Sequence, residues 1–233
     1  MFQAGVKEIR YKLASRYRQN TPEMRIPPLW DELYLKKWTA LVRALGRRYG
    51  SNDTIALVHI TGATGNGLEM QLPAEAEQRF KELGYTPEKV ITAWQRIIDA
   101  YADAFPDKPL DIDIHPVFGT TRVAEEEAAY GSMKLGKRFG VFGGWLSGKS
   151  ATEDRYHAGM HPIAERYGKR GFSAWQMIGN ETRQPERFAK GGLRTAIEQG
   201  LHWNSRYFEI WVADVRNEKL HPMLKEMAAA VRK

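Results

Sequence analysis

Residues 54–70, TIALVHITGATGNGLEM, form the stretch that decides the fold. An apolar run over residues 55–60 leads into a loop with three glycines, and the carboxylate of Glu69 follows. An apolar run of this length, bounded by turn residues, is typical of a strand in a parallel sheet. Loops after the carboxyl ends of such strands are where α/β folds place functional groups. The stretch therefore predicts a parallel sheet whose chemistry lies at the end marked by Glu69.

Strands and helices alternate along the rest of the chain. Further strands are expected over residues 110–115, 138–145, 171–178 and 207–214, with residues 9–15 as a sixth candidate. Helices are expected over residues 30–50, 86–105, 122–135, 161–167, 192–200 and 219–232. This alternation is typical of βαβ units. We expect an α/β fold in which residues 1–233 make a single TIM-barrel-like domain with about six parallel βα units, which is too few to close a barrel.

Two of these helices have recognisable start signals. Thr86 can cap the helix in which Pro87 occupies the first turn, and an apolar stripe at helical spacing follows. Asp31 can cap the helix that runs to Gly50. Both helices therefore have one buried face, which fits their packing against a sheet.

Composition excludes several classes of function. The 233 residues are 42% hydrophobic and 27% charged, which is typical of a globular protein with one good-sized core. The absence of cysteine excludes disulfides, thiolate metal sites and cysteine nucleophiles. The net charge of +7 comes from dispersed basic residues, so we expect no nucleic-acid partner. Residues 1–20 lack the apolar core of a signal peptide and no apolar run is long enough for a membrane span, so we expect neither, and the compartment stays unknown.

Polar side chains are expected on one side of several strands. Strict alternation over residues 110–115 places Asp111, Asp113 and His115 on the side opposite the apolar residues. The full set of candidates inside the sheet is His59, Asp113, His115, Gln176 and Glu209. A barrel interior that serves only packing favours branched apolar residues, so this set favours a functional site. For His59, a hydrogen-bonded structural role is the stronger alternative.

Two carboxylates suit acid–base chemistry on a sugar. Glu69 as general acid/base and Glu209 as nucleophile would provide the pair that glycoside hydrolysis needs. Glu181, just after a predicted strand, is a substitute for the second carboxylate, although a helix-start role explains it as well. Trp145 and Trp211 lie near strand ends, where they could stack on sugar rings or simply pack in the core.

Several short motifs resemble a known family. Residues 27–31 (PPLWD), the helix end at residues 46–50 (GRRYG) and the following strand and loop with Glu69 resemble the middle of clan A glycoside hydrolases of the β-galactosidase-like type. Residues 171–177 and 207–211 are similar to the last two barrel strands of such proteins. The resemblance implies a TIM barrel that lacks its first two βα units, with Glu69 as the acid/base.

Two departures from the family pattern affect the proposed residues. Members carry an Asn-Glu pair directly at the end of strand four, whereas Glu69 lies beyond a glycine-rich loop. Their nucleophile lies on strand seven, where this chain has Gln176, with Glu181 after it; Glu209 would fall on strand eight. The family resemblance therefore implies a carbohydrate partner. The protein would either hydrolyse the carbohydrate or bind it with a barrel that has lost catalytic activity.

Partner and cofactor expectations follow from this reading. An open barrel edge would favour self-association, so a homo-oligomer is expected to cover it. No cofactor is expected, and no metal is expected because no spacing of histidines and acids is distinctive of one.

The competing interpretation is a nucleotide-binding loop at residues 143–150, GGWLSGKS, in which Ser150 would hold Mg²⁺. The bulk of Trp145 and the acids that follow the motif weigh against it.

Overall fold

The main body of the protein is a parallel sheet with helices. The computed structural model describes residues 1–12, 23–154 and 157–231. The sheet has five strands in the order β3-β4-β5-β6-β7, all parallel. Its strands are β3 (Val58–Ile60), β4 (Leu110–Asp113), β5 (Phe139–Leu146), β6 (Phe172–Met177) and β7 (Ser205–Glu209).

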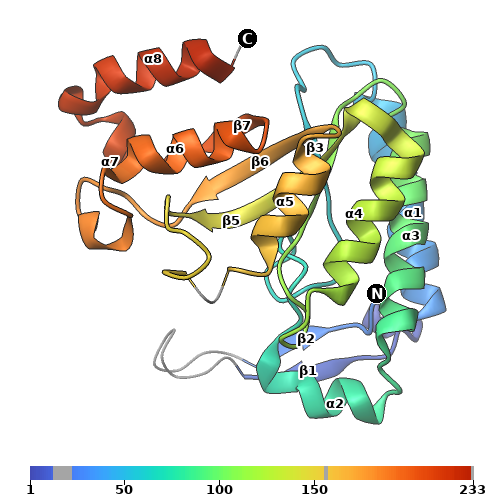
Figure 1. Ribbon diagram of the computed structural model, residues 1–233. Helices are drawn as coiled ribbons and strands as arrows, with labels where there is room; N and C mark the ends of the chain where they lie inside the picture. The colour runs from blue at the N-terminus through green and yellow to red at the C-terminus, as the bar shows by residue number, and fades with distance from the viewer. Residues whose placement is uncertain (13–22, 155–156, 232–233) are drawn as a thin grey trace.

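The helices connect successive strands and contact one another. They are α1 (Glu32–Tyr49), α2 (Glu77–Glu82), α3 (Pro87–Ala104), α4 (Arg122–Leu135), α5 (Met160–Gly168), α6 (Gly192–His202), α7 (Val212–Val215) and α8 (His221–Val231). α3, α4, α5 and α6 contact the strands that they join, and α1, α3, α4 and α5 pack in succession (Figure 1). α8 lies beside α6. The expected α/β fold with a parallel sheet is confirmed.

The start signals read from the sequence are present. The side chain of Asp31 accepts a hydrogen bond from the backbone N–H of Tyr34, and the side chain of Thr86 accepts one from that of Lys89. Pro87 is the first residue of α3. These caps fix where α1 and α3 begin, and so which of their faces is buried.

The two faces of the sheet differ in what covers them. Leu110 and Ile112 of β4 point into the main apolar core with the buried residues of the helices. We call the opposite side of the sheet the inner face. It carries the register pair of His59 with Asp111 and, one step along the strands, the row of Asp113, Phe142, Ala174 and Tyr207. Among the described residues, no helix covers this inner face. A smaller apolar cluster, Phe142, Phe172 and Ala174 with Leu57 and Leu68, lies on it.

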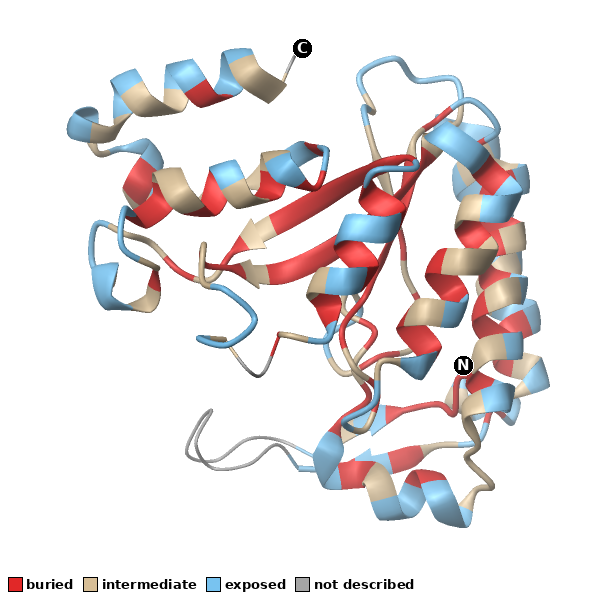
Figure 2. Ribbon diagram, in the orientation of Figure 1, coloured by how far each residue is buried: buried red, intermediate tan, exposed pale blue. Residues whose placement is uncertain are grey.

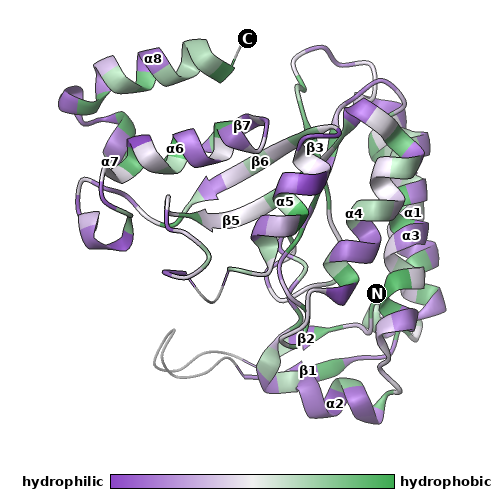
Figure 3. Cartoon of the chain, viewed as in Figure 1, coloured by the Kyte–Doolittle hydropathy of each residue, from purple (hydrophilic) through white to green (hydrophobic). Residues whose placement is uncertain are grey.

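Burial follows the same division. β5 and β6 are buried along nearly their whole length, whereas the helices alternate buried and exposed sides (Figure 2). Hydropathy alternates along the helices in the same way (Figure 3). The sheet, and β5 and β6 above all, is therefore the centre of the fold.

Three strand predictions are corrected by the structure. The candidate strand at residues 9–15 is β1 (Ile9–Tyr11), which pairs antiparallel with β2 (Met24–Ile26) instead of joining the parallel sheet; residues 13–15 lie outside the described residues. The strand at residues 207–214 ends at Glu209, and α7 begins at Val212. The parallel sheet therefore has five strands among the described residues, where about six parallel βα units were expected. Within the described chain, no strand pairs β3 with β7.

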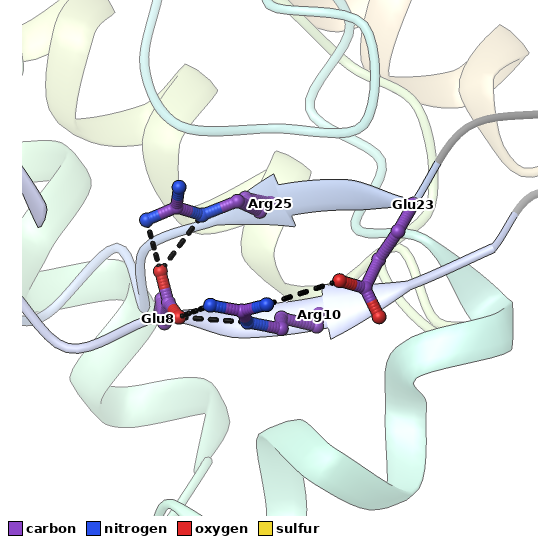
Figure 4. Close-up of polar contacts among 4 residues, drawn as sticks. All are labelled: Glu8, Arg10, Glu23 and Arg25. Atoms are coloured by element: carbon purple, nitrogen blue, oxygen red, sulfur yellow. Dashed lines mark hydrogen bonds and ion pairs between the residues drawn. The ribbon is translucent and has the colours of Figure 1, made fainter.

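The hairpin of β1 and β2 has an apolar and an ionic side. Ile9 and Ile26 are buried, while the ionic side carries Glu8, Arg10 and Arg25. Glu8 pairs with both arginines, and Arg10 also reaches Glu23 at 3.2 Å (Figure 4). Exposed ion pairs of this kind contribute little to stability, so the buried side is what attaches the hairpin to the body.

Candidate functional site

Polar side chains gather at the carboxyl ends of the strands on the inner face. β3 provides His59, β4 provides Asp111 and Asp113, and β6 and β7 provide Gln176 and Glu209. His59 pairs in register with Asp111, and Gln176 pairs with Glu209. The structure thus brings the predicted inward-facing residues to one side of one sheet.

The first pair on this face is His59 with Asp111. Nδ1 of His59 lies 2.6 Å from Oδ1 of Asp111, and the rings of Phe142 and Tyr207 meet the His59 ring edge-on at 5.1 and 5.9 Å. Asp111 is fully buried, whereas about a quarter of the His59 side chain is exposed. Burial lowers the pKa of His59, but the hydrogen bond and charge of Asp111 outweigh it, and the pKa is raised. The pair supports both a structural and a proton-binding role.

Asp113 ties the glycine-rich loop to the sheet. Its Oδ2 accepts hydrogen bonds from the backbone N–H of Met70 at 2.5 Å and of His115 at 3.0 Å, and its Oδ1 lies 2.7 Å from Nδ1 of His115. Asp113 and His115 are both buried. Because Met70 follows Glu69 in the chain, these bonds hold Glu69 above the end of β4. Asp113 is therefore a positioning group, not a side chain free to contact a substrate.

Glu69 lies half-buried next to His115. Gln71 donates to Oε2 of Glu69 at 3.0 Å. A Cβ added at Gly144 on β5 would lie 3.4 Å from Oε1 of Glu69 and 3.0 Å from Cε1 of His115, so both side chains close over this glycine. Burial raises the pKa of Glu69 and the charge of Asp113 adds to it, while His115 opposes the shift. A carboxyl group with a raised pKa suits a general acid.

Glu209 is held by its neighbour on β6. Nε2 of Gln176 donates to Oε2 of Glu209 at 2.7 Å. Both side chains are partly exposed at the end of the sheet. Trp211 follows outside β7, where its Nε1 donates to the carbonyl of Met177 at 3.0 Å and nearly half of the residue remains exposed. This hydrogen bond fixes an exposed aromatic ring beside the end that carries Glu209.

Glu181 has a structural role in this arrangement. Its Oε2 accepts the backbone N–H of Leu193 at 3.0 Å, which caps the start of α6. Buried Asp214 accepts the backbone N–H groups of Glu181 and Thr182 and the Thr182 hydroxyl. Asp214 thus fixes the chain after β6 to α7. The contact with Leu193 supports the alternative role of Glu181 at the start of a helix.

Trp145 lies between two histidines. Its ring centroid is 5.0 Å from that of His115 and 5.1 Å from that of His157, and its backbone has a φ of 69°. His157 in turn places Nδ1 2.6 Å from Oδ2 of Asp154. Sequence reasoning missed this pair; its signal is the spacing of three between the acid and the histidine. The Trp145 indole therefore packs against two imidazoles, which supports the packing role expected as the alternative to sugar stacking.

The glycine-lysine motif at residues 143–150 does not have the geometry of a phosphate-binding loop. Gly143 and Trp145 belong to β5, residues 151–153 form a turn, and the next helix, α5, begins only at Met160. The hydroxyl and backbone N–H of Ser150 donate to Oε2 of Glu153 at 2.6 and 2.9 Å. A phosphate loop needs free N–H groups at the start of a helix, so this segment gives the nucleotide hypothesis no support.

Comparisons with known proteins found no match. No family model, no curated protein and no solved structure matches the chain. Among the described residues, no group of three or more histidines and acids is placed to hold a metal ion. No helix in the described part of the chain is long and apolar enough to cross a membrane. The function therefore has to be argued from the inner face of the sheet.

Proposed function

We propose that the protein binds a carbohydrate at the carboxyl ends of its strands and hydrolyses a glycosidic bond with Glu69 and Glu209. The observation that carries the proposal is that both carboxylates lie at this end of the inner face, each with a glutamine donor on one oxygen. Donors of this kind orient a carboxylate without neutralising it. Parallel strands in sequential order, with their helices packed in succession, are also the arrangement of a barrel section.

The two carboxylates are assigned different roles by their surroundings. Burial raises the pKa of Glu69 and the charge of Asp113 adds to it, which suits Glu69 to the role of general acid toward a leaving glycosyl oxygen. Glu209, held by Gln176 at the end of β7, takes the role of nucleophile or general base. The exposed ring of Trp211, fixed by its bond to Met177, provides a face on which a sugar can stack.

The test is a hydrolysis screen of the purified protein against aryl glycosides and oligosaccharides. Glu69→Gln and Glu209→Gln should each abolish turnover, while Glu186→Gln, an exposed glutamate on another loop, should leave it unchanged. Turnover should also fall as rising pH removes the Glu69 proton, and the raised pKa of Glu69 places that fall above the range of an ordinary glutamate. Full activity in either active-site variant would remove that residue from the mechanism, and product stereochemistry by NMR would separate nucleophile from base.

Carbohydrate binding without hydrolysis is the second candidate. The observation that favours it is the open sheet, because within the described residues the five strands do not close into a barrel and no helix covers the inner face. A thermal-shift panel of oligosaccharides separates the two functions. Stabilisation by a sugar that the protein never cleaves, lost in Trp211→Ala, would favour binding alone.

A further inference from the structure

A second site lies at the opposite end of the sheet from Glu69 and Glu209. It is an open hollow of about 360 Å³ at the amino ends of the strands. The residues that line it are Ala56, Leu57, Pro109, Lys137, Arg138, Phe172, Arg206 and Tyr207. They come from segments that begin or precede β3, β4, β5, β6 and β7, so the hollow crosses the whole sheet.

The floor of the hollow is apolar and rigid. Phe172 is almost fully buried and belongs to the small apolar cluster with Leu57. Its ring lies flat on the backbone of β5, where a Cβ added at Gly140 would come within 2.3 Å of the ring. Tyr207 forms an exposed part of the floor, and its ring also contacts His59. A preformed apolar surface of this kind accepts a flat ligand at little cost in ordering.

The rim of the hollow is cationic. Lys137, Arg138 and Arg206 line it, and its lining contains no acid. Arg138 is held in place because its Nη1 donates to the carbonyls of Phe105 and Lys108, both at 2.9 Å. Lys137 and Arg206 are exposed, and neither enters an ion pair with another described residue. Three cations over an apolar floor are complementary to a ligand with an apolar body and a negative head.

We propose that this hollow binds a small aromatic anion, with its ring on Phe172 and Tyr207 and its oxyanion head on Arg206 and Lys137. The head is a phosphate, sulfonate or carboxylate, because these groups accept several charge-assisted hydrogen bonds from arginine and lysine. The cationic rim lies at the amino ends of the strands, whereas Glu69 and Glu209 lie at the carboxyl ends, and Tyr207 of β7 lies between the two regions. The anion site therefore stands whether or not the protein hydrolyses a sugar.

The experiment uses 1-naphthyl phosphate as the probe and backbone amide NMR of the full chain as the readout. Shift changes are expected at the residues that line the hollow, and Arg206→Gln and Lys137→Gln should each weaken binding about five-fold. Arg43→Gln on the exposed side of α1 makes the same charge change elsewhere and should leave the affinity unchanged.

Two further probes separate the parts of the proposal. 1-Naphthol and inorganic phosphate should each bind more weakly than the combined molecule, because each lacks one of its halves. Equal binding of 1-naphthol would overturn the role of the cations, and equal binding of inorganic phosphate would overturn the role of the apolar floor. Shift changes away from the hollow, or full affinity in both lysine and arginine variants, would overturn the site itself.

Discussion

Glu127 lies on the buried side of α4, and neither of its carboxylate oxygens has a hydrogen-bond partner among the described residues. Burial, with a contribution from the charge of Glu126, raises its pKa from 4.5 to about 9. Glu127 is therefore protonated in the folded protein at neutral pH, whereas the unfolded chain releases the proton. Stability from this group is fully present below the unfolded pKa and is lost as the pH rises toward the folded pKa.

The magnitude follows from the pH interval. Each pH unit between the two pKa values lowers the free energy of unfolding by about 1.4 kcal/mol. Raising the pH from 5 to 8 should therefore cost the wild-type protein about 4 kcal/mol from this residue. Glu127→Gln is neutral at both pH values and nearly isosteric, so it removes this cost. We expect the variant to match the wild type at pH 5 and to be the more stable protein at pH 8.

Urea unfolding followed by circular dichroism at several pH values measures the difference. Glu126→Gln, at the exposed neighbouring position, is the matched control: it removes a charge from α4 but leaves the buried acid, so it should still lose stability between pH 5 and 8. Comparison of the two variants separates burial from a change of net charge on α4. If Glu127→Gln and the wild type lose stability in parallel between pH 5 and 8, the reasoning about the buried acid is refuted.

Three further predictions test the candidate site and its support. Gly144→Ala places a methyl group 3.0 Å from Cε1 of His115, so it should lower the free energy of unfolding by about 1–3 kcal/mol and abolish any glycosidase activity; wild-type urea curves would contradict this. Asp214→Ala removes the carboxylate that accepts three hydrogen bonds, so it should lower the free energy of unfolding by about 2–4 kcal/mol in thermal or urea unfolding. An unchanged free energy of unfolding would show that other contacts hold the loop after β6. NMR titration should find the pKa of His59 above its ordinary value, and Asp111→Asn should lower that pKa because burial then dominates. An unchanged His59 pKa in the variant would show that Asp111 does not cause the shift.

Elements with strong local signals could be predicted closely. The capping threonine and the proline after it mark the start of α3, and α4 (Arg122–Leu135) has the predicted bounds. β4 follows from strict alternation, which also identified Asp111 and Asp113 as neighbours on one face. In these segments local propensity and tertiary packing favour the same structure.

Elements decided by distant contacts could not be predicted. The alternation after Glu209 continues as if β7 were longer, but the bond from Trp211 to the Met177 carbonyl ends the strand. Glu181 caps α6 because its carboxylate accepts the N–H of Leu193, which is twelve residues away in the chain. Gln71 donates to Glu69 because the glycine-rich loop brings the two side chains together. Periodicity contains no information about such contacts, so it identifies candidate side chains but not what they bind.

The sequential order of the strands has a consequence for how the molecule opens. Each strand pairs only with its neighbours along the chain, so the unit of β7 and α6 can separate while the pairing of β3, β4 and β5 stays intact. Local opening of this kind needs less free energy than global unfolding. Amide hydrogen exchange should therefore be fastest in the edge strands β3 and β7 and slowest in the central strand β5.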